Sequence, residues 1–454
     1  MGAFLDHIDR INPIVNAIVS LQERDVLLKQ ADERDTQLVR GEYLGRLHGF
    51  PQAIKDLTAT KGIRTTYGSP LLRDFLPPAD AFLVERIKQS GAIIIGKTNT
   101  PEFGLGSQTY NPVFGTTLNA YNQKKTAGGS SGGAAVSVAL GMQAVADGTD
   151  FCGSLRNPPA FNNVFGFRPS YGLIPTGPAE EIFVTQLSVP GPIGRTVSDV
   201  ALLLSVMAGH DSRSPFSIEG DPGMFLEPLK RDFDGTQIAW LGDLGGYLAM
   251  EPGILDLCEI SFKAFESMGC KIEPALPEFS PEENWATFVT LRHWLTAGNL
   301  SHFYNDPAQR QQLKPEAQWE IEGGLRLSAM DAYQASIKRS SFYQVINRMF
   351  ETYDYYLLPS AQVFPFGAEI HWPKEIDGRK MDTYHRWMEV YLLATLSGSP
   401  TMNVPVGFNR DGLPMGMQII GKNHGDLAVL QLAYAYEQAT QWVIKRPPQL
   451  LSQA

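Results

Sequence analysis

Cysteine is scarce in this chain, which has three cysteines among 454 residues. Cys152, Cys258 and Cys270 cannot form a disulfide framework, and none of them stands in C-x-x-C spacing. Isolated thiols are typical of a reducing compartment, so we expect a cytoplasmic protein. The eight histidines are scattered and include no H-E-x-x-H motif. We therefore expect no metal site, and we expect the closest histidine pair, His293 and His302, to be exposed or partly packed.

Long apolar runs and an excess of basic charge are also missing. The longest apolar runs, such as 92–95 and 200–207, are far too short to cross a bilayer. The first residues lack the basic segment and long apolar core of a secretory signal. Lysine and arginine number 38 against 48 aspartate and glutamate residues, a net charge of −10 at pH 7. Because an acidic surface repels nucleic acid, we expect neither a membrane nor a nucleic acid as a partner.

Glycine, by contrast, is abundant and gathers around two serines. The segment 128–133 reads Gly-Gly-Ser-Ser-Gly-Gly and contains Ser130, whereas the segment 148–156 reads Gly-Thr-Asp-Phe-Cys-Gly-Ser-Leu-Arg and contains Ser154. Glycine lets a backbone turn sharply and come close to a substrate. A serine on such a loop can project its hydroxyl while neighbouring N–H groups converge on an oxyanion. Two such loops indicate a nucleophile and a group that activates it.

The first half of the chain predicts helices followed by alternating strands and helices. Apolar residues at spacings of three and four predict helix over 3–40, with a fresh helix start at Asn12-Pro13. From 44 to 210, short apolar runs lie between glycines and prolines, and Thr196 begins a sequence with the form of a helix capping box. Alternating strands and helices are typical of an α/β fold with a largely parallel or mixed sheet.

The second half carries longer helical patterns, over 253–268 and 331–353, and clusters aromatic residues between 285 and 356. Strand-like segments at 237–241, 356–359 and 403–406 indicate that this half still contributes to the same sheet. We therefore predict one α/β domain over 1–454. Its parts are an N-terminal helical segment (1–40), a glycine-rich catalytic region (44–210), a variable, substrate-facing helical region (212–390) and a C-terminal return to the core sheet (391–454).

Further sequence blocks accompany the two serine loops. These blocks lie at 49–56, 91–103, 166–172, 191–196 and 412–421. With the serine loops, they resemble the motifs of the amidase signature family, serine hydrolases that cleave amide bonds with a Ser–Ser–Lys triad. The resemblance covers about residues 10–210 and 390–440, in the family's order. It implies one large domain with a central mixed β-sheet covered by helices on both sides, and an activity that needs no cofactor.

The resemblance also implies roles for individual residues. Ser154 would be the nucleophile that carries the acyl-enzyme, Ser130 the proton relay, which the family holds on a cis peptide, and Lys55 the base. A lysine base must be unprotonated near neutral pH, so burial must lower its pKa well below the usual value of about 10.4. The residues beside Lys55 are apolar enough to permit burial.

The loop around the nucleophile would supply the remaining groups. The backbone N–H groups implied for the oxyanion hole are those of Phe151, Cys152, Gly153 and Ser154. Ser131 would orient its loop, and Asp150 and Arg156 could pair to brace the nucleophile loop. The segment departs from the family's common Thr-Gly-Gly-Ser, because Phe151 adds bulk beside the acyl site and Cys152 restricts the backbone. A Cys152 nucleophile, as in nitrilase-like Cys–Glu–Lys amidases, is the weaker alternative because Ser154 retains its block.

Two motifs suggest other classes of protein and are disfavoured by their surroundings. The segment 91–98 matches the P-loop expression, but its four intervening residues are Ala-Ile-Ile-Ile, which read as a strand rather than a phosphate cradle. The segment 128–132 matches the G-x-S-x-G elbow of α/β-hydrolases, but a polar segment precedes it where that elbow needs an apolar strand.

The sequence therefore predicts a hydrolase that acts on carbon–nitrogen bonds other than peptide bonds in small linear amides. The aromatic residues of 285–356 and Phe151 favour an apolar or aromatic amide as substrate. The alternative is the glutaminase subunit of a tRNA-dependent amidotransferase, which also resembles the family and would pass ammonia to a partner protein. Homodimers are common in the family, so the resemblance allows a homodimer.

Overall fold

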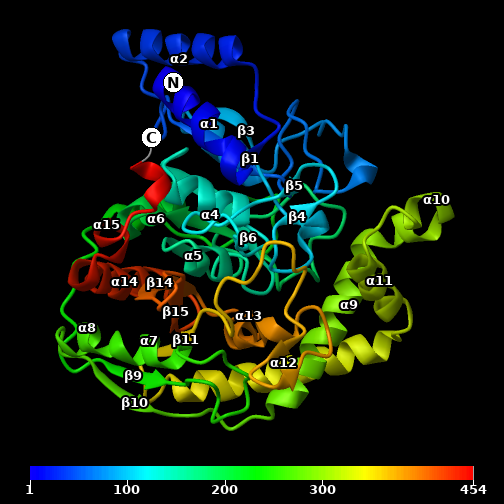
Figure 1. The fold of residues 1–454 in the computed structure, drawn as a ribbon, viewed down its shortest axis with the longest axis vertical. Coiled ribbons are helices and arrows are strands. Elements are labelled where there is room, and N and C mark those ends of the chain that lie inside the picture. The colour runs from blue at the N-terminus through cyan, green and yellow to red at the C-terminus, as the bar shows by residue number, and fades with distance from the viewer. Residues whose placement is uncertain (453–454) are drawn as a thin grey trace.

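An eight-stranded mixed sheet forms the centre of the computed structural model, which describes residues 1–452 (Figure 1). Strand β9 pairs in parallel with β10 and β11, and all other neighbours pair antiparallel. This arrangement confirms the predicted α/β fold with a mixed sheet. The strand order is β10 (Lys271–Pro274), β9 (Gln237–Trp240), β11 (Tyr355–Pro359), β15 (Pro414–Gly421), β14 (Thr401–Phe408), β7 (Phe165–Arg168), β8 (Val189–Gly194) and β6 (Val145–Asp150).

A second, three-stranded sheet packs beside the edge strand β6. Its order is β1 (Ile18–Val19), β3 (Ile93–Thr98) and β2 (Pro51–Lys55), with β2 parallel to β3 and β1 antiparallel to it. Two hydrogen bonds tie β2 to the β6 region, because the Ala53 N–H donates to Gln143 Oε1 at 2.8 Å and the Lys55 N–H to Asp147 Oδ1 at 3.1 Å. The C-terminal end of β2 is thereby fixed next to β6.

Helices cover both faces of the large sheet. A Cβ at Gly416 of β15 would meet Ala160 of α5 (Asn157–Phe161), whereas a Cβ at Gly421 would meet Val429 of α14 (Asp426–Thr440). These two strand positions are an odd number of residues apart, so their side chains point to opposite faces. Helices α5 and α14 therefore lie on opposite sides of the sheet, as predicted.

Part of the predicted substrate-facing region (212–390) folds into long helices, of which α9 and α11 lie at the right of Figure 1, whereas the rest of the region contributes β9, β10 and β11 to the large sheet. Helix α9 (Pro281–Asn305) starts at Ser280, whose hydroxyl accepts from the Glu283 N–H, and a proline occupies its first position. Helix α12 (Ala329–Met349) starts with a capping box at Ser328. Between them, α11 (Pro315–Leu325) packs along α9, and the short α10 (Pro307–Arg310) forms the turn.

The N-terminal segment differs from the expected helix over 3–40 with a fresh start at Asn12-Pro13. Helix α1 (Gly2–Val15) runs through Pro13, so no helix starts at Asn12. The Asn12 side chain instead accepts the N–H groups of Ala17 and Ile18 at 2.9 and 2.8 Å, which turns the chain into β1. Helix α2 (Arg24–Val39) follows and lies at the top of Figure 1.

The remaining elements are short. The expected helix over 253–268 is two helices, α7 (Ile254–Ile260) and α8 (Phe262–Glu266), joined at Ser261, whose hydroxyl donates to the Cys258 carbonyl. The capping box at Thr196 is confirmed at the start of α6 (Val197–Met207). The others are α3 (Phe82–Gln89), α4 (Gly132–Ala139), α13 (Leu392–Ser397), α15 (Trp442–Lys445), the β4 (Tyr110–Asn111), β5 (Gly115–Thr116), β12 (Glu375–Ile376) and β13 (Arg379–Lys380) strands, and 3₁₀ turns at 70–72, 102–104, 222–226, 386–391 and 449–451.

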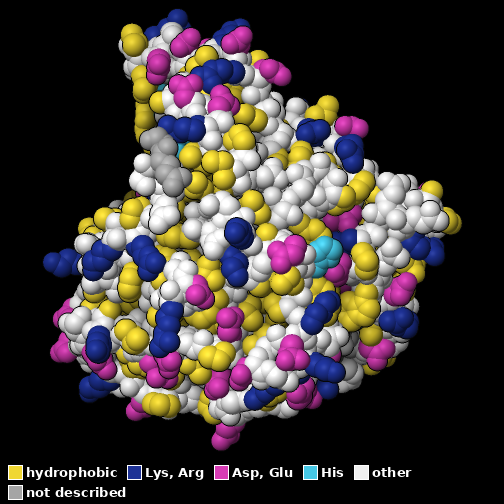
Figure 2. Space-filling model, in the orientation of Figure 1, with side chains coloured by type: hydrophobic (Ala, Val, Ile, Leu, Met, Phe, Trp, Pro, Cys, Tyr) yellow, Lys and Arg dark blue, Asp and Glu magenta, His cyan; other side chains and the backbone are white. Residues whose placement is uncertain are grey.

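The surface in Figure 2 carries basic and acidic side chains interspersed over the face in view. The interior holds a large apolar cluster around the eight-stranded sheet and a second one between α1, α4 and the small sheet. Among residues 1–452, the structure contains no helix that combines the length and the apolar character needed to cross a bilayer.

Candidate active site

Lys55, Ser130 and Ser154 meet at one point, although they are far apart in the sequence. Lys55 ends β2, Ser130 lies in the loop before α4, and Ser154 lies in the loop after β6. The Lys55 Nζ atom is 2.8 Å from the Ser130 Oγ atom, which is 2.9 Å from the Ser154 Oγ atom. The Ser130 N–H also donates to Ser154 Oγ at 2.9 Å. These contacts form a continuous path for a proton from the Ser154 hydroxyl to the Lys55 amine.

The glycines around Ser130 allow its loop to lie flat against the neighbouring backbone. The Gly129–Ser130 peptide bond is cis, as the sequence resemblance implied. A Cβ at Gly129 would lie 2.7 Å from the Gln108 N atom, and a Cβ at Gly132 would collide with the Thr109 side chain. A side chain at either position would push the loop away from residues 107–109 and displace the Ser130 hydroxyl.

Lys55 is fully buried and surrounded by hydroxyl groups. Its Nζ atom lies 2.7 Å from Ser131 Oγ and 2.9 Å from Thr149 Oγ1. Burial lowers the pKa of Lys55 from 10.5 to about 7, although the carboxylates of Asp147 and Asp150 act in the opposite direction. A large fraction of Lys55 is therefore neutral near pH 7 and able to accept a proton. The sequence assigned Ser131 to the orientation of its loop, and the contacts of Lys55 with Ser131 and Thr149 were not anticipated.

A second buried lysine lies close to Asp147. Lys97 of β3 donates to the Thr58 carbonyl at 2.6 Å and to Thr60 Oγ1 at 2.8 Å. Burial raises the pKa of Asp147 to about 6 against the charge of Lys97, and burial lowers the pKa of Lys97 to about 8. The P-loop interpretation of 91–98 is wrong, because this segment contains a buried strand and Lys97 is enclosed. Its local motif gave no signal for the effect of the Lys97 charge on the pKa of Asp147.

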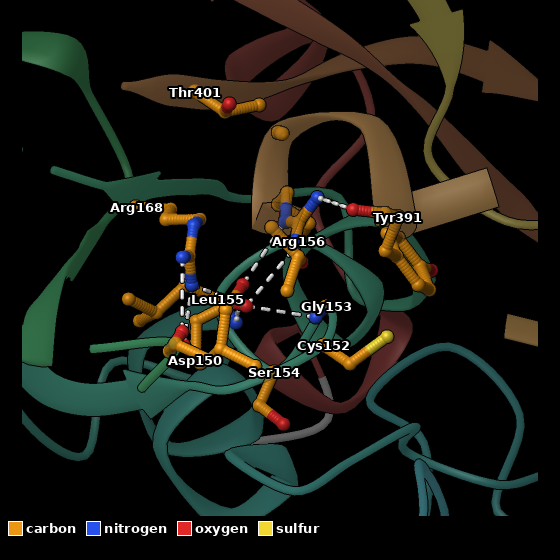
Figure 3. A network of polar contacts seen from close by, with 12 residues as sticks. Asp150, Cys152, Gly153, Ser154, Leu155, Arg156, Arg168, Tyr391 and Thr401 are labelled. Atoms are coloured by element: carbon orange, nitrogen blue, oxygen red, sulfur yellow. Dashed lines mark hydrogen bonds and ion pairs between the residues drawn. The ribbon is translucent and has the colours of Figure 1, made fainter. Parts of the chain in front are cut away.

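The carboxylate of Asp150 organises the loop that carries Ser154 (Figure 3). It accepts the Gly153 N–H at 2.8 Å and the Leu155 N–H at 3.0 Å. The Arg156 guanidinium donates to it through Nε and Nη2 at 3.0 and 2.9 Å, and Arg168 of β7 donates at 3.1 Å. Burial alone would raise the pKa of Asp150, but the two arginines lower it below its ordinary value. The Asp150–Arg156 pairing proposed from the sequence is present, and Arg168 adds a second cation.

Arg156 also connects the nucleophile loop to the far end of the chain. Its Nη1 atom donates to the Tyr391 carbonyl at 3.0 Å and to Gln418 Oε1 at 2.8 Å, and its Nη2 atom donates to Thr395 Oγ1 at 3.0 Å. These partners belong to the α13 region and β15. Their separation of more than 200 residues from Arg156 left no signal in the sequence.

The backbone N–H groups near Ser154 divide into two sets. The Gly153 N–H, which the sequence assigned to an oxyanion hole, is engaged by Asp150. The N–H groups of Phe151, Cys152 and Ser154 have no acceptor within residues 1–452. Buried N–H groups are rarely left unpaired, so these three donors are available to a bound oxyanion. In Figure 3 the Ser154 hydroxyl points away from Asp150 and its arginines, so this hydroxyl and the network around Asp150 lie on different sides of the loop.

Gly153 is required by its surroundings. Its φ angle of +97° lies in the region that favours glycine, and a Cβ there would lie 2.5 Å from the Tyr391 ring.

Cys152 is buried beside the Met388 carbonyl at 3.9 Å, and burial raises the pKa of its thiol to about 12. A thiol with this pKa is protonated near neutral pH and is a poor nucleophile, which disfavours the Cys152 alternative.

Two aromatic rings and an arginine pack against one another beside the loop that carries Ser154. The Phe151 ring lies 6.2 Å from the Phe288 ring, and the Arg292 Cζ atom lies 5.0 Å from the Phe151 ring. Phe288 and Arg292 both come from α9. Phe288 of the aromatic region 285–356 thus lies beside Phe151, whereas Phe350 of the same region stacks on Tyr356 in the core.

His293 is buried, whereas we expected it to be exposed or partly packed. Its Nδ1 atom lies 2.9 Å from Glu320 Oε2 of α11, and its ring packs on Trp319 at 4.4 Å between centroids. The neighbouring His302 is exposed, as expected. The close packing of α11 on α9 encloses His293, and a single-sequence spacing pattern does not contain that information.

Comparisons with known proteins agree on one family. The family model "Amidase" matches residues 1–430. An acylamidase of Rhodococcus erythropolis is 34% identical over 448 residues, which are 98% of this chain and 92% of that protein. A glutamyl-tRNA(Gln) amidotransferase subunit of Thermosynechococcus vestitus is 33% identical over 471 residues, covering 98% and 95%. The crystal structure of a bacterial aryl acylamidase, described as an amidase signature enzyme, matches with a TM-score of 0.91 and 28% identity over 97% of this chain and 92% of that chain.

Proposed function

The chain belongs to the amidase family, the amidase signature enzymes that hydrolyse carbon–nitrogen bonds, and we propose that it is a free-standing hydrolase of small, apolar or aromatic linear amides. The observation that carries this proposal is the chain of contacts from Lys55 Nζ through Ser130 Oγ to Ser154 Oγ, at 2.8 and 2.9 Å. The reaction passes through an acyl-enzyme on Ser154.

The attack step uses each group of this chain. Lys55, neutral in a large fraction near pH 7, accepts a proton from Ser130, which accepts one from Ser154. The Ser154 Oγ atom forms a bond to the amide carbon, and the carbonyl π electrons move to oxygen. The N–H groups of Phe151, Cys152 and Ser154 donate to that oxyanion, a contribution that typically accounts for about 10²–10³ in rate for each donor.

The second half of the reaction reverses the proton path. As the C–N bond breaks, Ser130 delivers its proton to the leaving nitrogen and regains one from the Lys55 ammonium. The amine departs and leaves an ester on Ser154. Water then attacks the ester carbonyl while Ser130 and Lys55 take up its proton, and the acid is released with the serine restored. Asp150, braced by Arg156 and Arg168, keeps the loop in the geometry that both steps need.

The second candidate function is the glutaminase subunit of a tRNA-dependent amidotransferase. It is favoured by the amidotransferase relatives, whose identity to this chain is close to that of the acylamidase. The charge arrangement near Phe151 favours the hydrolase instead. Arg292, the arginine beside Phe151, is already paired with Glu320 at 2.5 Å. The charged head group of glutamine needs polar or charged partners. Here it would face Arg292, whose charge Glu320 already compensates, and the aromatic ring of Phe151.

A substrate panel separates the two candidates. Ammonia or amine release is measured from aryl amides, aliphatic primary amides and glutamine, with Ser154→Ala as the inactive control. Turnover of an apolar amide that disappears in Ser154→Ala supports the hydrolase. Activity on glutamine alone, or no activity until a partner protein is added, would transfer the assignment to the amidotransferase.

Two further aspects belong to this proposal. A cytoplasmic location is supported by the free thiols of all three cysteines. A homodimer, common among enzymes of this family, is tested by measuring the mass of the purified protein in solution by light scattering. A mass of twice the chain's 50.1 kDa supports it.

A further inference from the structure

A buried arginine beside the nucleophile loop has one nitrogen without a partner. Arg292 of α9 donates through Nε to Glu320 Oε1 at 2.5 Å and through Nη2 to the Tyr384 hydroxyl at 2.7 Å. Its Nη1 atom makes no hydrogen bond within residues 1–452. Although Arg292 is only 4% exposed, its Nη1 atom is not enclosed by protein and reaches solvent-accessible space, where a ligand or water can accept its hydrogen bond.

The Arg292 cluster lies between the two loops that border the catalytic serines. On one side, the Arg292 Cζ atom is 5.0 Å from the ring of Phe151, whose N–H is an oxyanion donor. On the other side, the Tyr384 ring lies 3.8 Å from where a Cβ at Gly106 would stand. Two residues earlier in that loop, a Cβ at Gly104 would stand 3.6 Å from Ser130 Oγ. The Arg292 cluster therefore lies between the loop that carries Ser154 and the 104–106 loop, which passes beside Ser130.

The charge of Arg292 is compensated inside the protein. Burial alone would raise the pKa of Glu320, but Arg292 and the imidazoles of His293 and His385 hold it well below its usual range, so the carboxylate is ionised. Burial lowers the pKa of His385, which keeps that imidazole neutral near pH 7. Because Glu320 already balances Arg292, a substrate carboxylate here would add an uncompensated negative charge, whereas a neutral oxygen acceptor would not.

We propose that Arg292 Nη1 is the specificity determinant of this site and donates a hydrogen bond to a neutral oxygen, such as an ether, keto or hydroxyl oxygen, in the acyl half of the substrate. The inference rests on the proposed amide hydrolase. It narrows the substrate class from apolar amides to amides whose acyl chain is mainly apolar and carries one uncharged acceptor. Tyr384 and Glu320 hold the guanidinium in place, and they act as positioning residues.

The geometry of the reaction assigns the acceptor to the acyl half. The leaving nitrogen must come within reach of Ser130 Oγ to receive its proton, and the carbonyl oxygen must face the N–H groups of Phe151 and Cys152. The acyl chain, the third substituent of the reacting carbon, then extends along the loop that carries Phe151, whose ring lies 5.0 Å from the Arg292 Cζ atom.

Matched 4-nitroanilides test the inference with a single optical readout. Methoxyacetyl is compared with butanoyl and 3-methoxypropanoyl with pentanoyl, so that one ether oxygen replaces one methylene at two positions. Because hydrogen bonds to a charged donor are among the stronger ones, we expect kcat/KM for one ether substrate to exceed that of its isostere by about tenfold or more. The succinyl 4-nitroanilide, with a carboxylate, should be a poorer substrate than either ether.

Two variants connect the preference to Arg292. Arg292→Lys keeps the charge beside Glu320 but lacks the second terminal nitrogen, and Arg292→Met with Glu320→Met removes both charges together. In each variant the ether-to-methylene ratio should fall to about one. The matched control is Arg386→Lys, an arginine stacked over Trp285 and paired with Glu282, in which the ratio should stay unchanged. Circular dichroism checks that each variant is folded.

The outcomes are distinct from those of the proposed function. A ratio of about one in the wild-type protein, or a ratio that survives in both variants, would overturn the role of Arg292. So would a preference that appears only when the ether is moved to the aniline ring, as in butanoyl 4-methoxyanilide against butanoyl 4-ethylanilide. No turnover of any amide would instead overturn the proposed function, and this inference with it.

Discussion

The low pKa of Lys55 predicts how the reactivity of Ser154 depends on pH. Ser154 reacts only when Lys55 can accept a proton through Ser130, so reactivity follows the neutral fraction of Lys55. With a pKa of about 7, about 9% of Lys55 is neutral at pH 6 and about 99% at pH 9. Reactivity should therefore rise about tenfold over this interval and level off above about pH 8.

An ordinary lysine would behave differently. With the unperturbed value of 10.5, the neutral fraction would rise about a thousandfold from pH 6 to pH 9 and show no plateau. The cause of the difference is burial, since Lys55 has no solvent contact and the charges nearest to it, Asp147 and Asp150, would by themselves raise its pKa. The midpoint of the pH profile thus reports how far burial lowers the pKa of Lys55.

The assay needs no knowledge of the substrate. A small sulfonyl fluoride forms a bond from sulfur to Ser154 Oγ and releases fluoride, and intact-protein mass reports the rate of labelling at each pH, with Ser154→Ala as the unlabelled control. Lys55→Ala and Ser130→Ala should each lower this rate, and kcat for a substrate, by several orders of magnitude without unfolding the protein. A midpoint above about pH 9, a flat profile, or a near-normal rate in either variant would refute the reasoning.

Three further predictions concern the surroundings of the catalytic serines. Asp147→Asn removes a negative charge that raises the pKa of Lys55, so the midpoint of the labelling profile should move to lower pH, and a shift to higher pH would contradict the assignment. Cys152→Ala should keep a labelling rate within about fivefold of wild type, because a thiol with a pKa of about 12 does not react; complete loss of labelling would point to Cys152 instead. Gly153→Ala places a methyl group against the Tyr391 ring at a φ angle of +97°. It should lower the free energy of unfolding by about 1–3 kcal/mol, measured by urea denaturation, and should also lower the labelling rate. Wild-type values for both would show that the loop is not constrained at Gly153.

The sequence predicted the groups that lie within a local motif. The two serines and Lys55 stand in short sequence blocks, and the resemblance of those blocks to the motifs of the amidase signature family implied their roles. Asp150 and Arg156 are six positions apart on one loop, so their pairing could be proposed as well. The mixed sheet followed from the alternation of apolar runs, and the division of the chain into four segments stays a prediction.

The contacts that cross the fold could not be predicted in the same way. Arg156 reaches Gln418, and Arg292 reaches Tyr384, through packing that no local pattern encodes. The Gly153 N–H was expected in the oxyanion hole, but it donates to the side chain of Asp150, which lies three residues earlier in the chain. That contact depends on side-chain orientation, which the residue types alone leave open. The sequence predicted a new helix at Asn12-Pro13, but α1 continues through Pro13. The Asn12 side chain is not a helix cap there, because it accepts the N–H groups of Ala17 and Ile18 after the helix.

The most direct test of Ser154 as the nucleophile is to trap the acyl-enzyme. The protein is mixed with an apolar aryl ester or anilide that deacylates slowly, quenched in acid within seconds, and digested for peptide mass analysis. We expect a mass increase equal to the acyl group on Ser154, and no increase in Ser154→Ala. An acyl group on Cys152 or Ser131, or free acid produced with equal speed by Ser154→Ala, would contradict this role of Ser154.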